Sequence, residues 1–172
     1  LCWSLDKIGP MCRFAEDTAL VLAGINGHDP ADAGSLAHGF AYDGNRPLSR
    51  LSVGYDPRML DAEDTTASDR AAFKAMRNYG LNLVELKFPE LPWDIIGPNL
   101  EAEASAAFET LTLSGADDKM RRQIFNAWPN TFRMAHFNSG VTLVQCDRIR
   151  RGIMEILHTF FARTDVFFAP WN

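Results

Sequence analysis

The stretch LSVGYDPRMLDAEDTTASDRAAFKAMRNYGLNLVELKF, residues 51–88, carries the pattern of a strand, a helix and a second strand. Residues 51–55 alternate apolar with small or polar residues, which is typical of a strand. Gly80 supplies a helix stop, and residues 81–88 form the second predicted strand. The residues at helical spacing before that stop are Ala72, Phe73, Met76 and Tyr79. Two strands joined by a helix within about 40 residues make a βαβ unit, so the strands should be parallel with a right-handed crossover.

Outward from this unit, the sequence alternates between further helices and one more strand. Within the unit, an acidic, hydroxyl-rich lead-in at residues 61–68 offers several N-caps to its helix. Further along, the predicted segments are a Pro-rich connection at 89–98, helices at 101–113, 117–128 and 140–163, an irregular segment at 129–138, and a short buried strand at 165–169. This alternation predicts an α/β fold, layered α/β/α, with a mixed, partly parallel sheet.

The longest predicted helix, residues 140–163, carries an apolar stripe and a charged stripe. Ser139 precedes it and is expected to cap the helix rather than to act as a nucleophile. The residues expected to be buried are Ile149, Ile153, Ile156, Leu157 and Phe160. The residues expected to form an exposed ion-pair ladder are Asp147, Arg151 and Glu155, which lie four apart.

The stretch SLDKIGPMCRFAEDTALVL, residues 4–22, predicts an extended piece, a Gly-Pro corner and a helix. Glu16 and Asp17 fall in the first helical turn, where carboxylates suit the positive end of the helix dipole. The helix is apolar on every face, so we expect it to be buried on more than one side. Residues 28–50 are rich in Gly, Asp and Pro without periodicity and predict a loop.

Composition narrows the class of protein. The chain has 172 residues, enough for one domain, and a formal net charge of −5, whereas a surface that binds duplex nucleic acid usually shows a basic excess. No apolar run reaches the roughly 18 residues that a membrane span needs. Cys2, Cys12 and Cys146 lack C-x-x-C spacing, which favours buried thiols and a reducing, cytoplasmic compartment over a disulfide framework.

The residues alone show no catalytic set. None of the serines lies in G-x-S-x-G, and neither a phosphate-binding Gly-rich loop nor H-E-x-x-H occurs. The loop residues His28, Asp29, Asp32 and His38 could ligate a metal, but they have no recognised ligand spacing, and we expect none to be bound. His136 and His158 are isolated, which favours structural roles.

Four parts of the sequence together resemble the amidase signature family. Residues 4–32 follow the pattern S-L-D-x-x-G-P-[IM]-x-R-[ST]-[VA]-x-D-x-A-L-[VLI]-L and then I-x-G-x-D-x-x-D. Residues 145–150 look like that family's [AQ]-x-x-R-x-R helix, and residues 165–170 look like its D-[VA]-[LF]-[LFV]-x-P strand. The βαβ unit resembles the family's L-R-V-G strand and the unit that follows it. Phe14 departs from the pattern, because the family usually has Thr or Ser there, and Phe cannot cap the helix.

The resemblance implies a partial amidase-signature fold whose catalytic groups lie elsewhere. The family uses a Lys, a Ser in a cis peptide and a nucleophilic Ser, all upstream of the S-L-D-x-x-G-P segment, and needs neither metal nor cofactor. No residue of this chain therefore receives a catalytic label. We expect residues 1–172 to be the C-terminal part of a single amidase domain, cut at both ends and inactive alone.

The resemblance also selects candidate residues near the active-site region. The family-motif residues with expected structural roles are Asp6, Gly9, Pro10, Arg13 and Asp17. An ion pair or backbone hydrogen bonds between Asp6 and Arg13 would fix the Gly-Pro corner. Gln145 and Arg148 are candidates for the substrate pocket, and they share one helix face with Gly152, where close packing is expected.

Three functions remain open at this stage. The first is an amidase that hydrolyses the carbon–nitrogen bond of a small-molecule carboxamide through an acyl-enzyme. The second is the glutaminase-like A subunit of a tRNA-dependent amidotransferase. The third is a non-catalytic α/β binding or assembly module. The expected partners are the amide substrate and the remainder of the amidase domain, without direct nucleic-acid or membrane contact, and a homodimer remains open.

Overall fold

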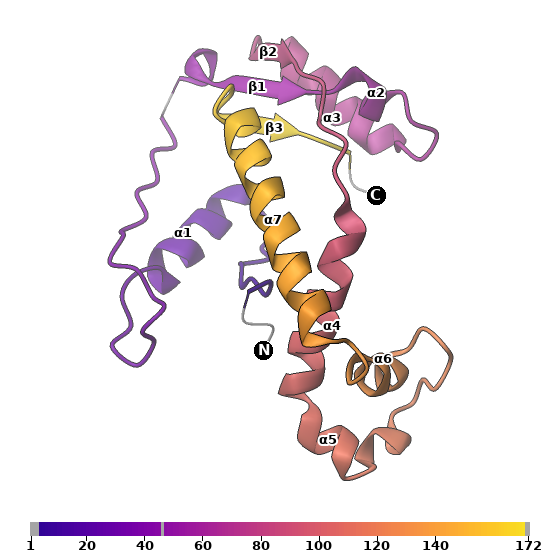
Figure 1. Cartoon of the computed structure of the whole chain (residues 1–172). Coiled ribbons are helices and arrows are strands. Elements are labelled where there is room, and N and C mark those ends of the chain that lie inside the picture. Colours follow the sequence, from indigo (N-terminus) through magenta and orange to yellow (C-terminus); the bar gives the residue numbers. More distant parts are fainter. Residues whose placement is uncertain (1–3, 46, 171–172) are drawn as a thin grey trace. The chain divides into compact units, whose positions relative to one another are not determined.

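The computed structural model describes residues 4–45 and 47–170. The described residues divide into two compact units, one that combines residues 4–6 with residues 51–170 and one that comprises residues 7–45 and 47–50 (Figure 1). The larger unit holds the sheet and all but one of the α-helices in the described part of the chain.

A small parallel sheet forms one end of the larger unit. Its strands are β1 (Ser52–Tyr55), β2 (Asn82–Glu85) and β3 (Val166–Phe168), in the order β2-β1-β3. Val53 pairs with Leu83 on one side and with Val166 on the other, and both pairings are parallel. The predicted βαβ unit is therefore confirmed, with α3 (Ala67–Asn78) between its two strands.

Gly54 in the central strand is required by close packing. A Cβ atom at this position would lie 2.9 Å from Leu86 Cδ1 and 3.0 Å from both Phe167 Cδ2 and Thr164 Oγ1. Leu86 is almost fully buried and follows the neighbouring strand. Only glycine lets these side chains cross the middle of the sheet.

Helices cover the two faces of this sheet. On one face, the ring of Phe73 from α3 lies with its centroid 4.8 Å from Tyr55 and 5.9 Å from Phe168. On the other face, Phe160 from α7 (Gly140–Phe161) lies 5.3 Å from Phe167. Successive residues of a strand point to opposite faces, so the arrangement has the predicted α/β/α layers. All pairings among the described strands are parallel, whereas the sequence predicts a mixed sheet.

Local sequence signals place both ends of α3. Thr66 Oγ1 accepts from the Asp69 N–H, and the Asp69 side chain accepts from the Thr66 N–H, which makes a complete capping box. Gly80, with φ of 71°, ends the helix in the left-handed region that glycine favours. A short helix, α2 (Pro57–Leu60), precedes α3 and is capped by Asp56.

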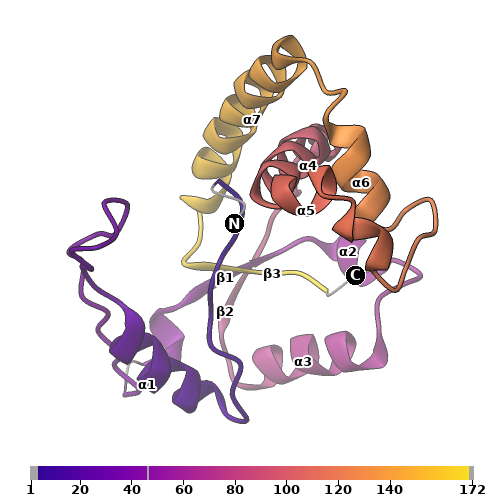
Figure 2. The ribbon, with the colours of Figure 1, turned by 90° about the horizontal axis from the view of Figure 1, so that it is seen from below.

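The rest of the larger unit is a helical cluster beside the sheet, formed by residues 4–6 and 93–161 (Figure 2). Its elements not yet introduced are η2 (Trp93–Ile95), α4 (Ile96–Ala107), α5 (Glu109–Leu113), η3 (Ala116–Lys119) and α6 (Trp128–Ala135). The helix expected at 101–113 begins five residues earlier, because Pro98 is tolerated in a first turn. It is interrupted at Phe108, which joins α4 to α5.

Two predicted segments of this cluster are wrong. The helix expected at 117–128 is only the 3-10 turn of η3, and the segment 129–138, expected to be irregular, contains α6. Pro129 stands in the first turn of α6, where its missing N–H costs nothing, so it does not break the helix. Phe132 and Ala135 then bury one face of α6.

Helix α7 begins as predicted, and Ile153, Leu157 and Phe160 of the predicted stripe are buried or half-buried. The Ser139 hydroxyl accepts from the Thr142 N–H at 3.0 Å, which confirms the cap. The side chains buried or half-buried along the helix are Leu143, Cys146, Arg150, Ile153, Leu157 and Phe160, whereas Ile149 and Ile156 are exposed. Arg151 pairs with Glu155 at 2.8 Å, but Asp147 accepts instead from Asn99 of α4, so the predicted ladder has only one step.

The smaller unit contains residues 7–14, α1 (Ala15–Ile25), the turn η1 (Leu48–Arg50) and the described loop residues between them. Phe14 makes no side-chain cap, as expected from its departure from the pattern. Burial of α1 on more than one side was expected, but only Ala19 is buried, and Leu20 is 66% exposed. Most of the apolar residues of this helix are therefore exposed in the described part of the chain.

The thiols only partly follow the expectation of burial. Cys146 is buried on α7, whereas Cys12 is exposed, and Cys2 lies outside the described residues. No helix of the described residues is both long enough and apolar enough to cross a membrane.

Candidate functional site

Ser4 lies between α4 and α7 and is held by both helices. Its N–H and hydroxyl donate to the two carboxylate oxygens of Glu103 on α4, at 2.8 and 2.5 Å. The guanidinium of Arg150 on α7 donates to the Ser4 hydroxyl and to the Ser4 carbonyl, both at 2.7 Å. Every polar group of Ser4 is therefore bonded to a charged side chain.

A second polar contact extends this junction along the same two helices. Asn99 and Glu103 lie four apart on α4, and Asp147 and Arg150 lie three apart on α7, so each pair shares a helix face. The Asn99 side-chain amide donates to the Asp147 carboxylate at 2.5 Å. We call this row of contacts, with Ser4 inserted in it, the polar seam between α4 and α7.

Directly after Ser4, the chain enters an apolar environment. Leu5 packs against the buried pair Ala104 and Phe132, which joins α4 to α6. Beside this core lies a pocket with a volume of about 400 Å³. Its lining residues are Asp6, Leu100, Ala104, Phe108, Leu111, Met120, Trp128 and Phe132. Asp6 is thus the one lining residue that is not apolar.

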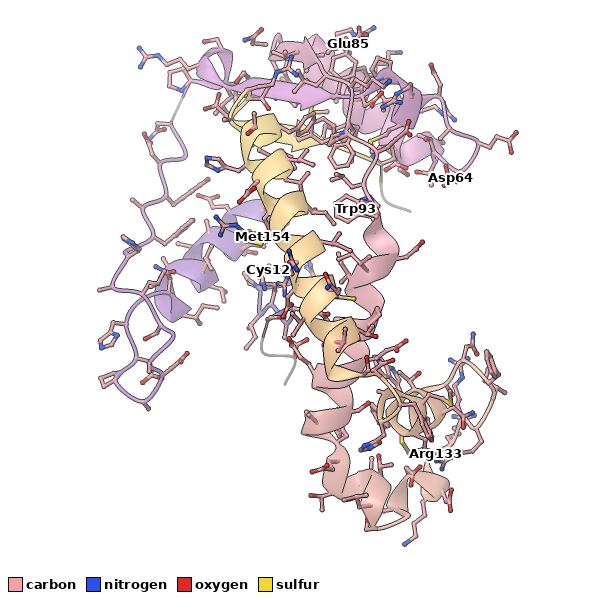
Figure 3. All side chains as sticks on the ribbon, viewed as in Figure 1. Cys12, Asp64, Glu85, Trp93, Arg133 and Met154 are labelled. Atoms are coloured by element: carbon pink, nitrogen blue, oxygen red, sulfur yellow. The ribbon has the colours of Figure 1, made fainter. Side chains whose placement is uncertain are left out.

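Arg133 fixes the wall of this pocket. It lies on α6 (Figure 3) and forms ion pairs with the buried Asp117 and with the exposed Asp118, the latter at 2.6 Å. Both carboxylates belong to η3, which leads into the pocket residue Met120. The ion pairs therefore hold the segment of Met120 against the helix that carries Trp128 and Phe132.

A second cleft, of about 610 Å³, lies at the carboxyl ends of the parallel strands. At its base, buried Asp56 accepts from the Arg58 side chain, at 2.6 Å from Nη2, and from the Phe88 N–H, at 2.8 Å. The hydrogen bond from Arg58 is the main cause that lowers the pKa of Asp56 to about 2, although burial acts in the opposite direction. Trp93, at the start of the helical cluster, also lines this cleft (Figure 3).

The predicted site residues fall in different places. Asp6 reaches the apolar pocket, whereas Gly9, Pro10, Arg13 and Asp17 belong to the smaller unit, so the expected pairing of Asp6 with Arg13 stays a prediction. Arg13 is exposed, and Asp17 is half-buried in the first turn of α1.

The residues predicted on α7 do not line the apolar pocket. Gln145 and Arg148 are exposed. A Cβ atom at Gly152 would meet nothing within 4 Å, so the close packing expected there is absent among the described residues. Their role in a substrate pocket stays a prediction.

The loop residues considered as metal ligands organise the loop itself. Asp29 and Asp32 each accept a hydrogen bond from the backbone N–H two residues further on, at 2.9 and 2.8 Å. His28 Nδ1 lies 3.1 Å from the Ser35 hydroxyl. No group of three or more His, Cys, Asp or Glu side chains in residues 4–45 and 47–170 is arranged to hold a metal ion.

Several residues of the site escaped the sequence reasoning. Glu103 gave no signal beyond its place in a helix, and Arg150 stood out only as part of the [AQ]-x-x-R-x-R pattern. Asp56 could have been found, because an Asp-Pro pair directly after a strand is a common helix start.

The fold and the site define an α/β protein in which the S-L-D segment is fixed beside an apolar pocket. Comparison with known families agrees, since a family model described as Amidase matches residues 1–171. The chain belongs to the amidase signature family.

Curated relatives carry a more specific name, the A subunit of Glutamyl-tRNA(Gln) amidotransferase. The chain is 25% identical to this protein from Neisseria meningitidis (strain FAM18) over 198 aligned residues, which cover 97% of this chain and 40% of that protein. It is 39% identical to the protein of the same name from Deinococcus radiodurans over 108 residues, which cover 60% of this chain and 22% of that protein. The chain thus spans about 40% of the length of the relatives that it matches throughout. No solved structure matches it.

Proposed function

We propose that this chain is part of a single amidase domain that hydrolyses the carbon–nitrogen bond of a carboxamide with an apolar acyl group. The observation that carries the proposal is the apolar pocket of about 400 Å³ next to Asp6 of the family motif, in a chain that matches the family along residues 1–171. Pockets of this size and composition are typical of small-ligand sites.

The chemistry would follow the family pattern of an acyl-enzyme. A serine upstream of the S-L-D segment attacks the amide carbonyl and forms an ester with the acyl group. The proton of that serine passes through the cis-peptide serine and the lysine to the leaving amine. Water then hydrolyses the ester. Residues of this chain supply none of these groups. Their part is to bind the acyl group, so that the carbonyl is presented to the nucleophile.

The lining of the pocket supports apolar rather than charged acyl groups. Seven of its eight lining residues are apolar, and the eighth, Asp6, is an acid that repels a substrate carboxylate. Each additional methylene in such a pocket improves binding by roughly 1–3 kcal/mol. We therefore expect phenylacetamide and hexanamide to be better substrates than acetamide.

The test uses the polypeptide encoded by the complete reading frame that contains this chain. Ammonia release should show a kcat/KM for phenylacetamide at least about tenfold above that for acetamide. Leu111→Trp should fill the pocket and remove this preference. Leu113→Trp is the matched control, because Leu113 lies on the same short helix but is 75% exposed and outside the pocket. Equal loss of the preference in both variants would contradict the proposal.

The isolated 172-residue chain provides a second test. It should not hydrolyse any simple aryl amide, because the proposed serines and lysine lie upstream. Turnover by the purified chain that a serine-directed reagent abolishes would show that the catalytic groups lie within these residues.

A second candidate function is favoured by the names of the relatives. The matched proteins from several bacteria are named as one component of Glutamyl-tRNA(Gln) amidotransferase, and a protein of this kind works within a larger assembly. In that case glutamine should release ammonia faster than phenylacetamide, and a second polypeptide should co-purify with the full-length protein. A reading frame that encodes neither the two serines nor the lysine upstream would contradict both candidates and favour a non-catalytic module.

A further inference from the structure

Ser4 is half-buried, and each of its polar groups forms a hydrogen bond to a charged side chain. Glu103 bonds its N–H and hydroxyl, and Arg150 bonds its hydroxyl and carbonyl, across 99 and 146 residues of sequence. We infer that Glu103 and Arg150 are positioning residues that fix the Ser4–Leu5–Asp6 segment at the mouth of the apolar pocket and so help to select the acyl group. The effect on substrates rests on the proposed function, whereas the effect on the segment does not.

The first step of the argument is geometric. Consecutive Cα atoms are 3.8 Å apart, so a fixed Ser4 leaves little freedom to the two residues that follow it. Leu5 packs on the core pair that borders the pocket, and Asp6 lines the pocket itself. A shift of Ser4 would therefore move Asp6, the one residue of the pocket lining that is not apolar.

The second step concerns charge. Hydrogen bonds that involve an ionised partner are about twice as strong as neutral ones. Glu103 and Arg150 are both half-buried, so water competes less for their bonds than at the surface. Ser4 lies between the two opposite charges and accepts from one while it donates to the other.

The third step distinguishes the contacts to Ser4 from the contacts that hold α4 and α7 together. Helices α4 and α7 are already joined by the bond from Asn99 to Asp147, and their backbones lie close together. Glu103 and Arg150 direct their hydrogen bonds to Ser4 instead. The seam can therefore lose its Ser4 contacts while the helix pair stays together.

The experiment begins with hydrogen exchange of the 172-residue chain. Arg150→Gln should loosen Ser4 and so speed exchange of its amide, which donates to Glu103, by about ten- to a hundredfold, the range expected for lost hydrogen bonds to a charged group. Arg151→Gln is the matched control, since it removes the same charge one residue away and breaks only an exposed pair with Glu155. Unchanged exchange in Arg150→Gln, with exchange in α4 and α7 intact, would overturn the inference.

Rescue and specificity provide the second readout. Arg150→Lys keeps the charge but cannot reach the hydroxyl and the carbonyl together, so it should restore part of the protection. In the active full-length protein, Arg150→Gln and Glu103→Gln should lower kcat/KM for phenylacetamide at least about fivefold more than for acetamide. An equal loss for both amides would show a purely structural role and would overturn the selection of the acyl group.

The two proposals fail in different ways. A full-length protein that hydrolyses neither amide would refute the proposed function, but the exchange result would still decide whether Ser4 is fixed by Arg150. Glu101→Gln serves as the control for Glu103→Gln, because Glu101 is also half-buried on α4 but lines another surface pocket.

Discussion

The βαβ unit and the helical cluster of the larger unit are stabilised by contacts of different sequence range. In the βαβ unit, Asp56 bonds Arg58 two residues away and Phe88 at the end of the same stretch. In the cluster, Ser4 bonds residues that are 99 and 146 positions away. The bonds of Asp56 therefore close within one continuous piece of chain, although β1 also pairs with the distant strand β3, whereas the cluster needs both ends of the sequence to meet.

The largest expected effect concerns the core of the helical cluster. Phe132 is 3% exposed, and its ring centroid lies 5.1 Å from that of Phe108 and 5.6 Å from that of Trp128. Phe132→Ala should lower the free energy of unfolding by about 4 kcal/mol, because it removes a buried ring and leaves a cavity. Urea denaturation followed by tryptophan fluorescence measures this loss.

The same variant tests whether the helical cluster can lose its structure while the βαβ unit stays folded. Hydrogen exchange in Phe132→Ala should rise in α4 and α6 while β1 and α3 stay protected. Phe137→Ala is the control, since Phe137 is 82% exposed just after α6 and should change the stability by no more than about 0.5 kcal/mol. Equal loss of protection in both regions would show that they unfold together.

The difference in sequence separation between contacting residues also explains what could be predicted from the sequence. The βαβ unit was predicted correctly because its sequence signals are local. The strand alternation, the capping residues and the stop at Gly80 each act on positions only a few residues away. The α6 helix was missed because Pro129 reads as a breaker unless the burial of Phe132 is known. The exposure of Ile149 and Ile156 was missed because both fit the 3.6-residue period, and only the position of α4 decides which stripe is covered.

The candidate site was harder to predict than the fold. The sequence pointed to the S-L-D segment through a family pattern, and Asp6 does line the pocket. The partners of Ser4 are a glutamate and an arginine on two separate helices, and no local spacing connects them. Such a junction depends on tertiary packing, which a pattern along the chain does not contain.

The second effect, of intermediate size, is a pH dependence at the edge of the βαβ unit. The Arg58 hydrogen bond holds the pKa of Asp56 at about 2, below its ordinary value of 3.8. A lowered folded-state pKa gives stability that is present above about pH 4 and is lost as the pH falls toward 2. The contribution of Asp56 should therefore decrease by about 2 kcal/mol over this range.

Asp56→Asn provides the control for this titration. The variant should be less stable by about 3 kcal/mol at neutral pH, because Arg58 and the Phe88 N–H lose a buried carboxylate partner. It should also lack the component of acid destabilisation between pH 4 and pH 2. Asp61→Asn, an exposed neighbour, should keep the wild-type profile. An unchanged profile in Asp56→Asn would show that other carboxylates dominate the acid transition.

The smallest effect separates local from long-range stabilisation most directly. Thr66→Ala removes the capping box of α3 and should lower the free energy of unfolding by about 1 kcal/mol. Ser68→Ala is the matched control, because Ser68 is exposed in the same first turn and does not cap the helix. Since the cap acts only within α3, its loss should speed hydrogen exchange in that helix and leave the Ser4 amide unchanged. Faster exchange at Ser4 in Thr66→Ala would mean that the βαβ unit supports the polar seam, and the two regions would then have to be treated as one cooperative structure.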